Sequence, residues 1–257
     1  MRAWCESPVR QQFERQFAHY LASSPMADRT VLDAIAALAP VQPGQRLLDV
    51  ACGAGFLLRT YQELGAEVFG VDLSDAMLRA ARSTLGPIVP AHHLVAADAC
   101  DLPFACEAFD VVTCKLAFHY FAEPQRALVE MGRVCRRSGL IVVIDRVTSD
   151  HPAQCAAQNR LEKLRTPNKV RVYRERELVE LLQSTGLTVV RRCMVVQPTS
   201  FAEWMSAAGA GDRNEQAKAL LFGPIGEDLT GLAPEGCGDS LTIRHRTLIL
   251  VATFAKP

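Results

Sequence analysis

The chain has no net charge and no long apolar run. Its 28 lysines and arginines balance 28 aspartates and glutamates, which argues against a polyanionic partner such as a nucleic acid. No apolar stretch is long enough to span a membrane, and residues 1–6 lack the apolar core of a secretory signal. We therefore expect a cytoplasmic protein with no nucleic-acid partner and no membrane span.

Cysteines spaced as metal ligands are also missing. The nine cysteines are an odd number and are scattered, without C-x-x-C pairs or histidines at ligand spacing. We expect them to be reduced and mostly buried, acting as small apolar residues, with no metal site. The length of 257 residues suits one α/β domain with a large core, with or without a lid.

The most informative stretch is LLDVACGAGF, from Leu47 to Phe56. An apolar run reaches a carboxylate and a turn containing glycine, and an alternating apolar pattern continues to Leu64. This order predicts a strand, a tight turn and a helix, the first unit of an open α/β sheet. Ligands of such sheets bind at the carboxyl ends of the strands. Gly53 and Gly55 have no Cβ and let a ligand lie against the turn.

Two classes of cofactor use a turn of this kind. A dinucleotide site favours G-x-G-x-x-G, but Leu58 occupies the third glycine position here. Asp49 lies at the tip of the predicted strand, where a carboxylate disfavours phosphate groups. The same carboxylate suits the amine and the sulfonium of S-adenosylmethionine. The motif therefore favours a methyl donor over a nicotinamide dinucleotide.

Two further predicted strands also end on an aspartate. Glu67–Val71 is followed by Asp72, and His93–Ala97 is followed by Asp98. With Asp49, this gives three successive strands with a carboxylate at the ligand-binding edge. The series is more specific than any one of its members.

The second and third aspartates suggest two different contacts. Asp72 lies seventeen residues after Gly55, where an α/β cofactor fold places an acid against the ribose hydroxyls. A helix-capping role is the alternative, although Ser74 is itself a plausible N-cap. Asp98 and Ala99 are expected to face the adenine, whereas a lone aspartate after a strand is usually a turn residue.

The remaining elements are expected from periodicity and from turn residues. Residues 8–40 are predicted to form two helices, with a break at Ser23–Pro25 and the second helix over 28–38. The aromatic residues of this region either pack on the edge of the sheet or cap the cofactor. In the second case the Tyr20 side chain would reach into the cofactor site. Further predictions are strands over 109–114, 140–144, 187–196 and 245–254, and helices over 124–137, 201–208 and 214–222.

In this order, a larger set of residues closely resembles the class I S-adenosylmethionine-dependent methyltransferases. The set comprises Asp49, Gly53-Ala54-Gly55, Asp72, Asp98, Leu102-Pro103-Phe104, Phe109-Asp110, His119 and Glu130–Gly139. More narrowly, it resembles the small-molecule branch that includes ubiquinone and menaquinone C-methyltransferases and many natural-product enzymes. The resemblance is strong over 44–145, continues in a linker block at 159–171, and thins beyond about residue 197.

Four departures from the family pattern are mild. Ala51 replaces the first glycine of the usual loop, and Arg137-Ser138-Gly139 replaces Pro-Gly-Gly. Lys115 stands where related sequences often carry arginine. Tyr120 replaces the second of two histidines.

The resemblance implies a doubly wound, seven-stranded, mostly parallel sheet whose last strand is antiparallel. We expect one methyltransferase domain over 1–257, divided into an N-terminal helical cap (1–43), a cofactor-binding core (44–145), a linker or lid (146–173) and a helical insertion or lid before the last strand (197–243). The cofactor is expected to contact Asp49, Ala51, Gly53, Gly55, Asp72, Leu73, Met77, Asp98, Ala99 and Lys115.

Methyl transfer from a sulfonium needs mainly proximity and alignment, with a base only where the acceptor must lose a proton. His119 is the best candidate base, and the alternative is that it only shapes the pocket. Tyr20, Tyr120, Asp145 and Arg146 are further candidates, of which Asp145 could equally begin a turn.

Charge is unevenly distributed along the second half of the chain. Residues 158–176 are rich in lysine and arginine, and residues 201–240 are acidic. Solvated faces explain this pattern, but the two segments could also meet over the pocket as an electrostatically matched lid. Alternatively, Arg165 and Arg171 could bind an anionic group of the substrate.

The predicted function is methyl transfer to a small natural-product or quinone-like acceptor. A protein or RNA methyltransferase is an alternative, as is a protein that binds the cofactor to regulate or to catalyse another reaction. The sequence leaves open the acceptor, the methylated atom (carbon, oxygen or nitrogen) and the oligomeric state, monomer or dimer.

Overall fold

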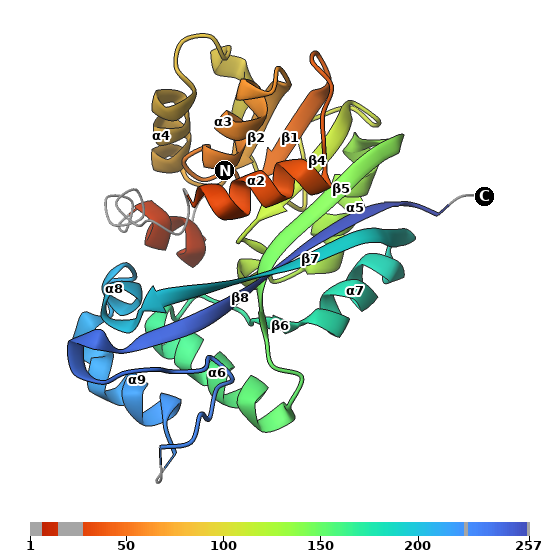
Figure 1. Ribbon diagram of the computed structural model, residues 1–257. Helices are drawn as coiled ribbons and strands as arrows, with labels where there is room; N and C mark the ends of the chain where they lie inside the picture. Colours follow the sequence, from red (N-terminus) through yellow and green to blue (C-terminus); the bar gives the residue numbers. More distant parts are fainter. Residues whose placement is uncertain (1–6, 15–27, 224–225, 256–257) are drawn as a thin grey trace.

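The computed structural model describes residues 7–14, 28–223 and 226–255 (Figure 1). One sheet organises them, with strand order β3-β2-β1-β4-β5-β8-β7 and the short β6 paired with β5. The strands are β1 (Arg46–Val50), β2 (Glu67–Asp72), β3 (Leu94–Ala96), β4 (Phe109–Lys115), β5 (Cys135–Thr148), β6 (Tyr173–Arg174), β7 (Leu187–Ser200) and β8 (Thr242–Phe254). Among these strands, β8 alone runs in the opposite direction to the others, and it pairs antiparallel with β5 and β7. The expected mostly parallel sheet is confirmed, and β6 raises the expected seven strands to eight.

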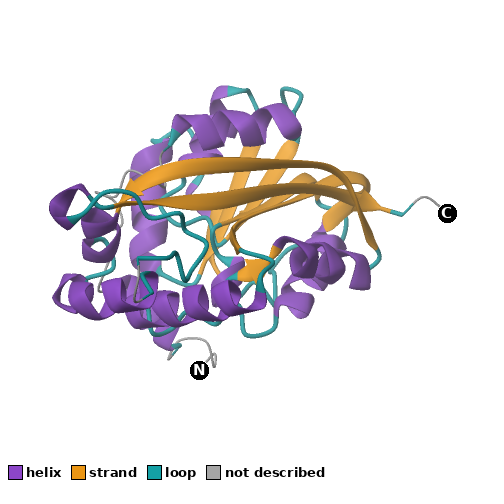
Figure 2. Cartoon of the chain, turned by 60° about the horizontal axis from the view of Figure 1, so that its bottom comes forward, coloured by secondary structure: helices purple, strands orange, loops and turns teal. Residues whose placement is uncertain are grey.

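Helices cover both faces of this sheet (Figure 2). They are a helix over residues 8–14, then α2 (Arg29–Leu38), α3 (Phe56–Glu63), α4 (Asp75–Leu85), α5 (Pro124–Val134), α6 (Pro152–Arg165), α7 (Glu175–Ser184), α8 (Phe201–Ser206) and α9 (Asn214–Leu221). On one face α2, α3 and α4 pack on the sheet, and on the other α5 and α7 do so. In β1, Leu47 faces the first layer and Leu48 the second, so both faces of the strand carry apolar side chains.

The predicted N-cap at Ser74 and the predicted start of a helix near residue 28 are confirmed. Asp28 caps α2 by accepting a hydrogen bond from the Thr30 amide, and Ser74 caps α4 by accepting one from the Met77 amide. Of the predicted pair of N-terminal helices, residues 15–27 lie outside the described residues, and Tyr20 is among them. The third strand begins at Leu94, because residues 91–93 form a turn of 3₁₀ helix.

The predicted helix over 124–137 was too long, because it ends at Val134. Strand β5 starts at once with Cys135, which pairs with Phe109, and the next pair is Val111 with Leu140. Residues 136–139 therefore form a bulge, where a Cβ on Gly139 would come within 2.6 Å of the Asp110 carbonyl oxygen. Strand β5 also continues past the predicted end at residue 144, because pairing with β8 extends the ladder to Val147 and Arg246.

Strands β7 and β8 are longer than predicted and carry the insertion at their far end. Helices α8 and α9 pack there on α6 in a separate apolar core (Figure 1) that includes Leu161, Trp204 and Ile243. The contact between the two oppositely charged segments includes this apolar core, and the alternative of an electrostatically matched lid over the pocket stays a prediction. The basic side chains Lys169, Arg171 and Arg174 pair with acids of their own part of the chain, Glu162 and Glu177.

The cysteines are free, as expected, but not mostly buried. Of the eight described, Cys52, Cys114 and Cys135 are buried, and five are partly or fully exposed. Among the described helices, none combines the length and apolar character needed to cross a membrane.

Candidate active site

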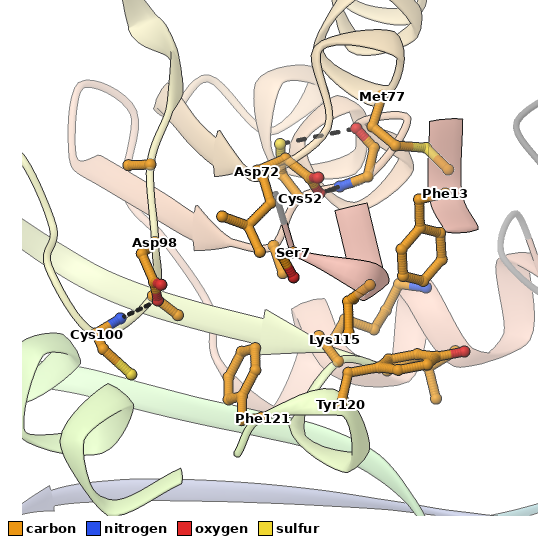
Figure 3. Close-up of a pocket in the computed structure, with 18 of the residues that line it drawn as sticks. Ser7, Phe13, Cys52, Asp72, Met77, Asp98, Cys100, Lys115, Tyr120 and Phe121 are labelled. Atoms are coloured by element: carbon orange, nitrogen blue, oxygen red, sulfur yellow. Dashed lines mark hydrogen bonds between the residues drawn. The ribbon is translucent and has the colours of Figure 1, made fainter. Parts of the chain in front are cut away.

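A cavity of about 490 Å³ lies at the carboxyl ends of β1, β2 and β4 (Figure 3). Each of these strands contributes a polar side chain to its wall, namely Asp49, Asp72 and Lys115. The loop after β3 adds Asp98, and the N-terminal residues add Ser7 and Phe13. The cavity thus lies at the carboxyl edge of the sheet, where the order of the motifs predicts that a ligand binds.

The turn between β1 and α3 places backbone atoms that no side chain covers at this cavity. Its residues Ala51, Gly53 and Gly55 all have positive φ angles, of 58°, 52° and 79°. A Cβ on Gly53 would meet nothing within 4 Å, whereas one on Gly55 would lie 3.1 Å from Ala81. Gly53 therefore leaves open space for a ligand, and Gly55 allows α3 and α4 to pack closely. Ala51 adopts a left-handed conformation that costs a non-glycine residue about 1–2 kcal/mol.

Asp49 is buried below the turn. Its Oδ1 accepts a hydrogen bond of 2.7 Å from the Thr113 hydroxyl on the neighbouring strand. Burial raises the pKa of Asp49 to about 7, against the opposing effects of Thr113 and Lys115. A cationic ligand group nearby would stabilise the charged form of this carboxyl.

Asp72 ends β2 and orients two neighbouring loops. Its Oδ2 accepts a hydrogen bond from the Gly53 amide and its Oδ1 accepts one from the Ser74 amide, both at 2.9 Å. Burial raises the pKa of Asp72 to about 6, the two amides oppose this shift, and the nearby charge of Glu14 adds to it. The carboxylate lines the cavity in a fixed orientation, as an acceptor for ligand hydroxyls would have to.

Asp98 forms a local turn beside the cavity. Its Oδ1 accepts a hydrogen bond of 2.9 Å from the Cys100 amide. The apolar residues Leu73, Met77, Ala99 and Phe121 also line the cavity. The wall could hold a flat, largely apolar ring with a polar edge.

Lys115 projects from the end of β4 next to Asp49. Burial lowers the pKa of Lys115 to about 8, and the charge of Asp49 opposes the shift. The next residue, Leu116, has a positive φ of 56° and also lines the cavity. A strained residue that directly follows a buried cation is a common feature of functional sites.

His119 lies behind the cavity wall. Its Nδ1 is 2.6 Å from Asp145 Oδ1, its backbone amide donates to Asp145 Oδ2 at 3.0 Å, and its carbonyl oxygen accepts from the Val170 amide at 2.8 Å. Burial lowers the pKa of His119, although Asp145 opposes the shift. The cavity is lined by its neighbour Tyr120. This arrangement favours the alternative in which His119 shapes the pocket, because its ring and its backbone together connect three segments.

The two arginines predicted to contact substrate lie elsewhere in the described part of the chain. Arg165 donates to the Trp204 carbonyl oxygen at 2.8 Å and lies over the Trp204 ring. Arg171 pairs with Glu177 at 2.7 Å and lies over Tyr173. Neither is among the described residues that line the cavity. Both side chains are used within the fold.

The N-terminal segment contributes cavity residues that the sequence did not reveal. Glu14 Oε1 accepts hydrogen bonds from the Ser74 hydroxyl at 3.1 Å and the Ala76 amide at 3.2 Å, at the start of α4. Arg10 pairs with Asp75 at 2.8 Å, and Asn168 donates to the Pro8 carbonyl oxygen at 3.0 Å. These contacts hold the helix over residues 8–14 against the cavity. The aromatic spacing of Phe13 was the only sequence signal for this placement.

No cluster of possible metal ligands occurs among the residues that the structure describes. The site thus combines a glycine turn, acids at the ends of successive parallel strands and an apolar wall. On an open α/β sheet these features are typical of a site for a nucleotide cofactor, in agreement with the methyltransferase fold expected from the sequence.

Comparison with known proteins supports this classification. Residues 48–143 match Methyltransf_11, a methyltransferase domain family. The demethylmenaquinone methyltransferase of Renibacterium salmoninarum is 38% identical over 117 residues, 46% of this chain and 46% of that protein. The uncharacterized methyltransferase YcgJ of Bacillus subtilis is 27% identical over 173 residues, 66% of this chain and 68% of that protein. The chain spans about half the length of the menaquinone methyltransferases it matches.

Solved structures show the same fold. The crystal structure of a candidate methyltransferase from Bacillus halodurans has a TM-score of 0.77 at 21% identity, and covers 86% of this chain and 97% of that chain. The chain thus contains a methyltransferase domain over residues 48–143 and is similar to enzymes of the ubiquinone and menaquinone branch. The resemblance seen in the sequence is confirmed.

Proposed function

We propose that this protein transfers the methyl group of S-adenosylmethionine to a small molecule. The observation that carries the proposal is the wall of acids and bare backbone at the carboxyl edge of the sheet, within the segment that matches the methyltransferase domain. When bound, S-adenosylmethionine supplies a methyl group already activated by a sulfonium.

The residues present fit this cofactor. Asp72 would accept hydrogen bonds from the ribose hydroxyls, because its two backbone partners fix its orientation. Asp49 and Lys115 offer opposite charges for the amine and carboxylate of the methionine portion. Leu73, Met77 and Ala99 provide an apolar wall for the adenine, beside Asp98. Gly53 leaves room for close contact with the turn.

The rest of the cavity would hold the acceptor. Val9, Phe13, Tyr120, Phe121 and Val170 line it, and the Phe13 and Tyr120 rings meet edge to face with centroids 5.2 Å apart. These side chains favour an apolar or aromatic molecule, in keeping with a quinone-like or natural-product acceptor.

The chain's residues would act mainly by positioning. The cavity wall holds both molecules and excludes water, and the helix over residues 8–14 closes one side. Tyr120 lines the cavity and is a closer candidate for contact with the acceptor than His119, whose Nδ1 is bonded to Asp145. The cap, core, linker and insertion, and a cytoplasmic location, remain our proposals for the organisation of the protein.

The test is calorimetric titration with S-adenosylmethionine and, separately, with NAD. Micromolar binding of S-adenosylmethionine alone, followed by turnover in a screen of small aromatic acceptors, would support the proposal. Binding of NAD in its place would contradict it. Binding of S-adenosylmethionine with turnover only on protein or RNA would refute the small-molecule acceptor, and tight binding with no demethylated product would favour a regulator or another reaction.

A further inference from the structure

A second group of polar side chains lies behind Tyr120, outside the cavity wall. We call it the polar cluster. Its five members come from β5, α6, the loop after α6, α8 and β8, and each is 3% exposed or less: Thr148, Glu162, Lys169, Trp204 and His245. Such complete burial of polar groups is unusual unless they are paired.

The members of the polar cluster are close to one another. Lys169 Nζ lies 2.7 Å from Glu162 Oε2, and the rings of Trp204 and His245 have centroids 5.3 Å apart. Val147 of β5 pairs with Arg246 of β8, so the next residues, Thr148 and His245, lie side by side. The cluster is thus one continuous patch between the sheet and α6.

Several polar atoms of the cluster have no partner in the described part of the chain. They are Thr148 Oγ1, Glu162 Oε1, Trp204 Nε1 and both ring nitrogens of His245. Buried polar atoms without a partner destabilise a fold, and native proteins contain few of them. Three of these groups, Thr148, Trp204 and His245, can donate a hydrogen bond.

The charge around the cluster is mainly positive. Burial lowers the pKa of His245 well below its ordinary value, and Arg146, Arg165 and Lys169 lower it further, against Glu162 alone. Although burial opposes it, the cations Lys169 and Arg165 hold the pKa of Glu162 below its usual range. Glu162 is therefore ionised, and the positive charges around it outweigh its negative charge. His245 is neutral.

The cluster adjoins the cavity through Tyr120. Lys169 Nζ lies 5.8 Å from the centre of the Tyr120 ring, and both neighbours of Lys169, Asn168 and Val170, line the cavity. The half-buried Tyr120 side chain thus both lines the cavity and meets the cluster at Lys169.

We propose that the polar cluster binds a carboxylate of the methyl acceptor, while the apolar body of the acceptor lies in the cavity. The inference rests on the proposed function and adds the substrate class, an apolar or aromatic acid. Donors without partners and an excess of positive charge are what a desolvated carboxylate requires. A neutral acceptor would leave the positive charge of the site unbalanced.

Trp204 provides a local signal for the test. The chain has two tryptophans, so the Trp4→Phe variant leaves Trp204 as the sole emitter. With S-adenosylhomocysteine bound, this variant is titrated with benzoate and with benzyl alcohol, which have similar bodies but differ in charge. We expect benzoate to change the Trp204 emission saturably and to bind at least about tenfold more tightly than benzyl alcohol.

His245→Leu in the same background should weaken benzoate binding about tenfold and leave the calorimetric affinity for S-adenosylhomocysteine unchanged. His93→Leu is the matched control: His93 is also buried, but it interacts with the Val68 carbonyl oxygen near the other edge of the sheet. It should leave benzoate binding unchanged.

Equal binding of the two probes, or no emission change with either, would overturn the proposal in the Trp4→Phe protein itself, even if His245→Leu fails to fold. The polar cluster would then be a structural feature of the core. Absence of S-adenosylhomocysteine binding would instead refute the proposed function on which this inference rests.

Discussion

The carboxylate of Asp72 and the backbone amide of Gly53 are joined by a hydrogen bond of 2.9 Å. This bond connects the end of β2 to the glycine turn after β1, and Ser74 completes the arrangement from the other side. The turn and the acid are therefore positioned together, and a ligand that contacts one of them lies against the other.

Replacement of Asp72 by alanine should weaken binding of S-adenosylmethionine by about 2–4 kcal/mol, or roughly 30- to 1000-fold, because two charge-assisted hydrogen bonds to the ribose would be lost. Calorimetry measures the change. Asp33→Ala serves as the control, because Asp33 is an exposed acid of α2 that pairs with Arg29 and is not among the described residues that line the cavity. A loss of less than threefold in the Asp72 variant would remove the ribose assignment.

The pKa of Asp49 predicts how stability depends on pH. Its value is about 7 in the fold and 3.8 as the reference for the unfolded chain. The folded state holds the proton more tightly, so ionisation favours unfolding. The contribution of Asp49 to stability should be present below pH about 4 and lost as the pH rises to about 7.

Urea unfolding of the wild type and of Asp49→Asn across this range provides the test. Asparagine keeps an acceptor for the Thr113 hydroxyl but cannot ionise. The variant should therefore lose less stability than the wild type between pH about 4 and about 7. Parallel curves for the two proteins would show that Asp49 does not titrate in this range.

Much of the fold could be predicted from local patterns. The apolar run before Asp49 and the cap at Ser74 depend on neighbours in sequence, and the structure places them as expected. The end of α5 at Val134 could not be foreseen, because it depends on the pairing of Cys135 with Phe109 on another strand.

In the candidate site too, features set by local sequence could be predicted and features set by distant contacts could not. Acids at strand ends are visible in the sequence because parallel strands share one ligand-binding edge, and Asp49, Asp72 and Asp98 all line the cavity. Charge density did not identify contacts to the cavity, since Arg165 and Arg171 are used within the fold. The placement of residues 8–14 depends on contacts such as Glu14 with Ser74, which no local pattern shows.

His119 should matter for stability more than for turnover. His119→Ala removes a buried hydrogen bond to Asp145 and should lower the free energy of unfolding by about 1–3 kcal/mol. Below its melting temperature, the variant should keep turnover within about tenfold of the wild type, because the ring does not line the cavity in the described structure. Urea unfolding and a methyl-transfer assay measure the two effects.

Asp145→Asn tests the same contact from the other side. Both oxygens of the buried Asp145 carboxylate accept hydrogen bonds from N–H groups, so the asparagine NH2 would face a donor at one of them. The variant should therefore cost at least as much stability as His119→Ala. Turnover reduced by about 10²–10⁴ in a His119→Ala protein of normal stability would instead identify His119 as a general base.

Glu14 should control how firmly the N-terminal helix closes the cofactor site. Its carboxylate accepts hydrogen bonds from Ser74 and from the Ala76 amide at the positive end of α4. Glu14→Ala should therefore raise the dissociation rate of S-adenosylhomocysteine about three- to tenfold, in line with the loss of about 1 kcal/mol from one cap. Stopped-flow displacement measures this rate.

Glu63→Ala is the control for this prediction, because Glu63 is a partly exposed acid that pairs with Arg59 on α3 away from the cavity. A dissociation rate unchanged in Glu14→Ala would show that residues 8–14 do not limit release of the cofactor.

Glu14→Gln separates the two effects of the carboxylate: it keeps an acceptor for the Ala76 amide but removes the negative charge that raises the pKa of Asp72. If release depends on the cap alone, Glu14→Gln should retain most of the slow dissociation, whereas a gain in affinity above the wild type would show that the charge of Glu14 opposes ionisation of Asp72.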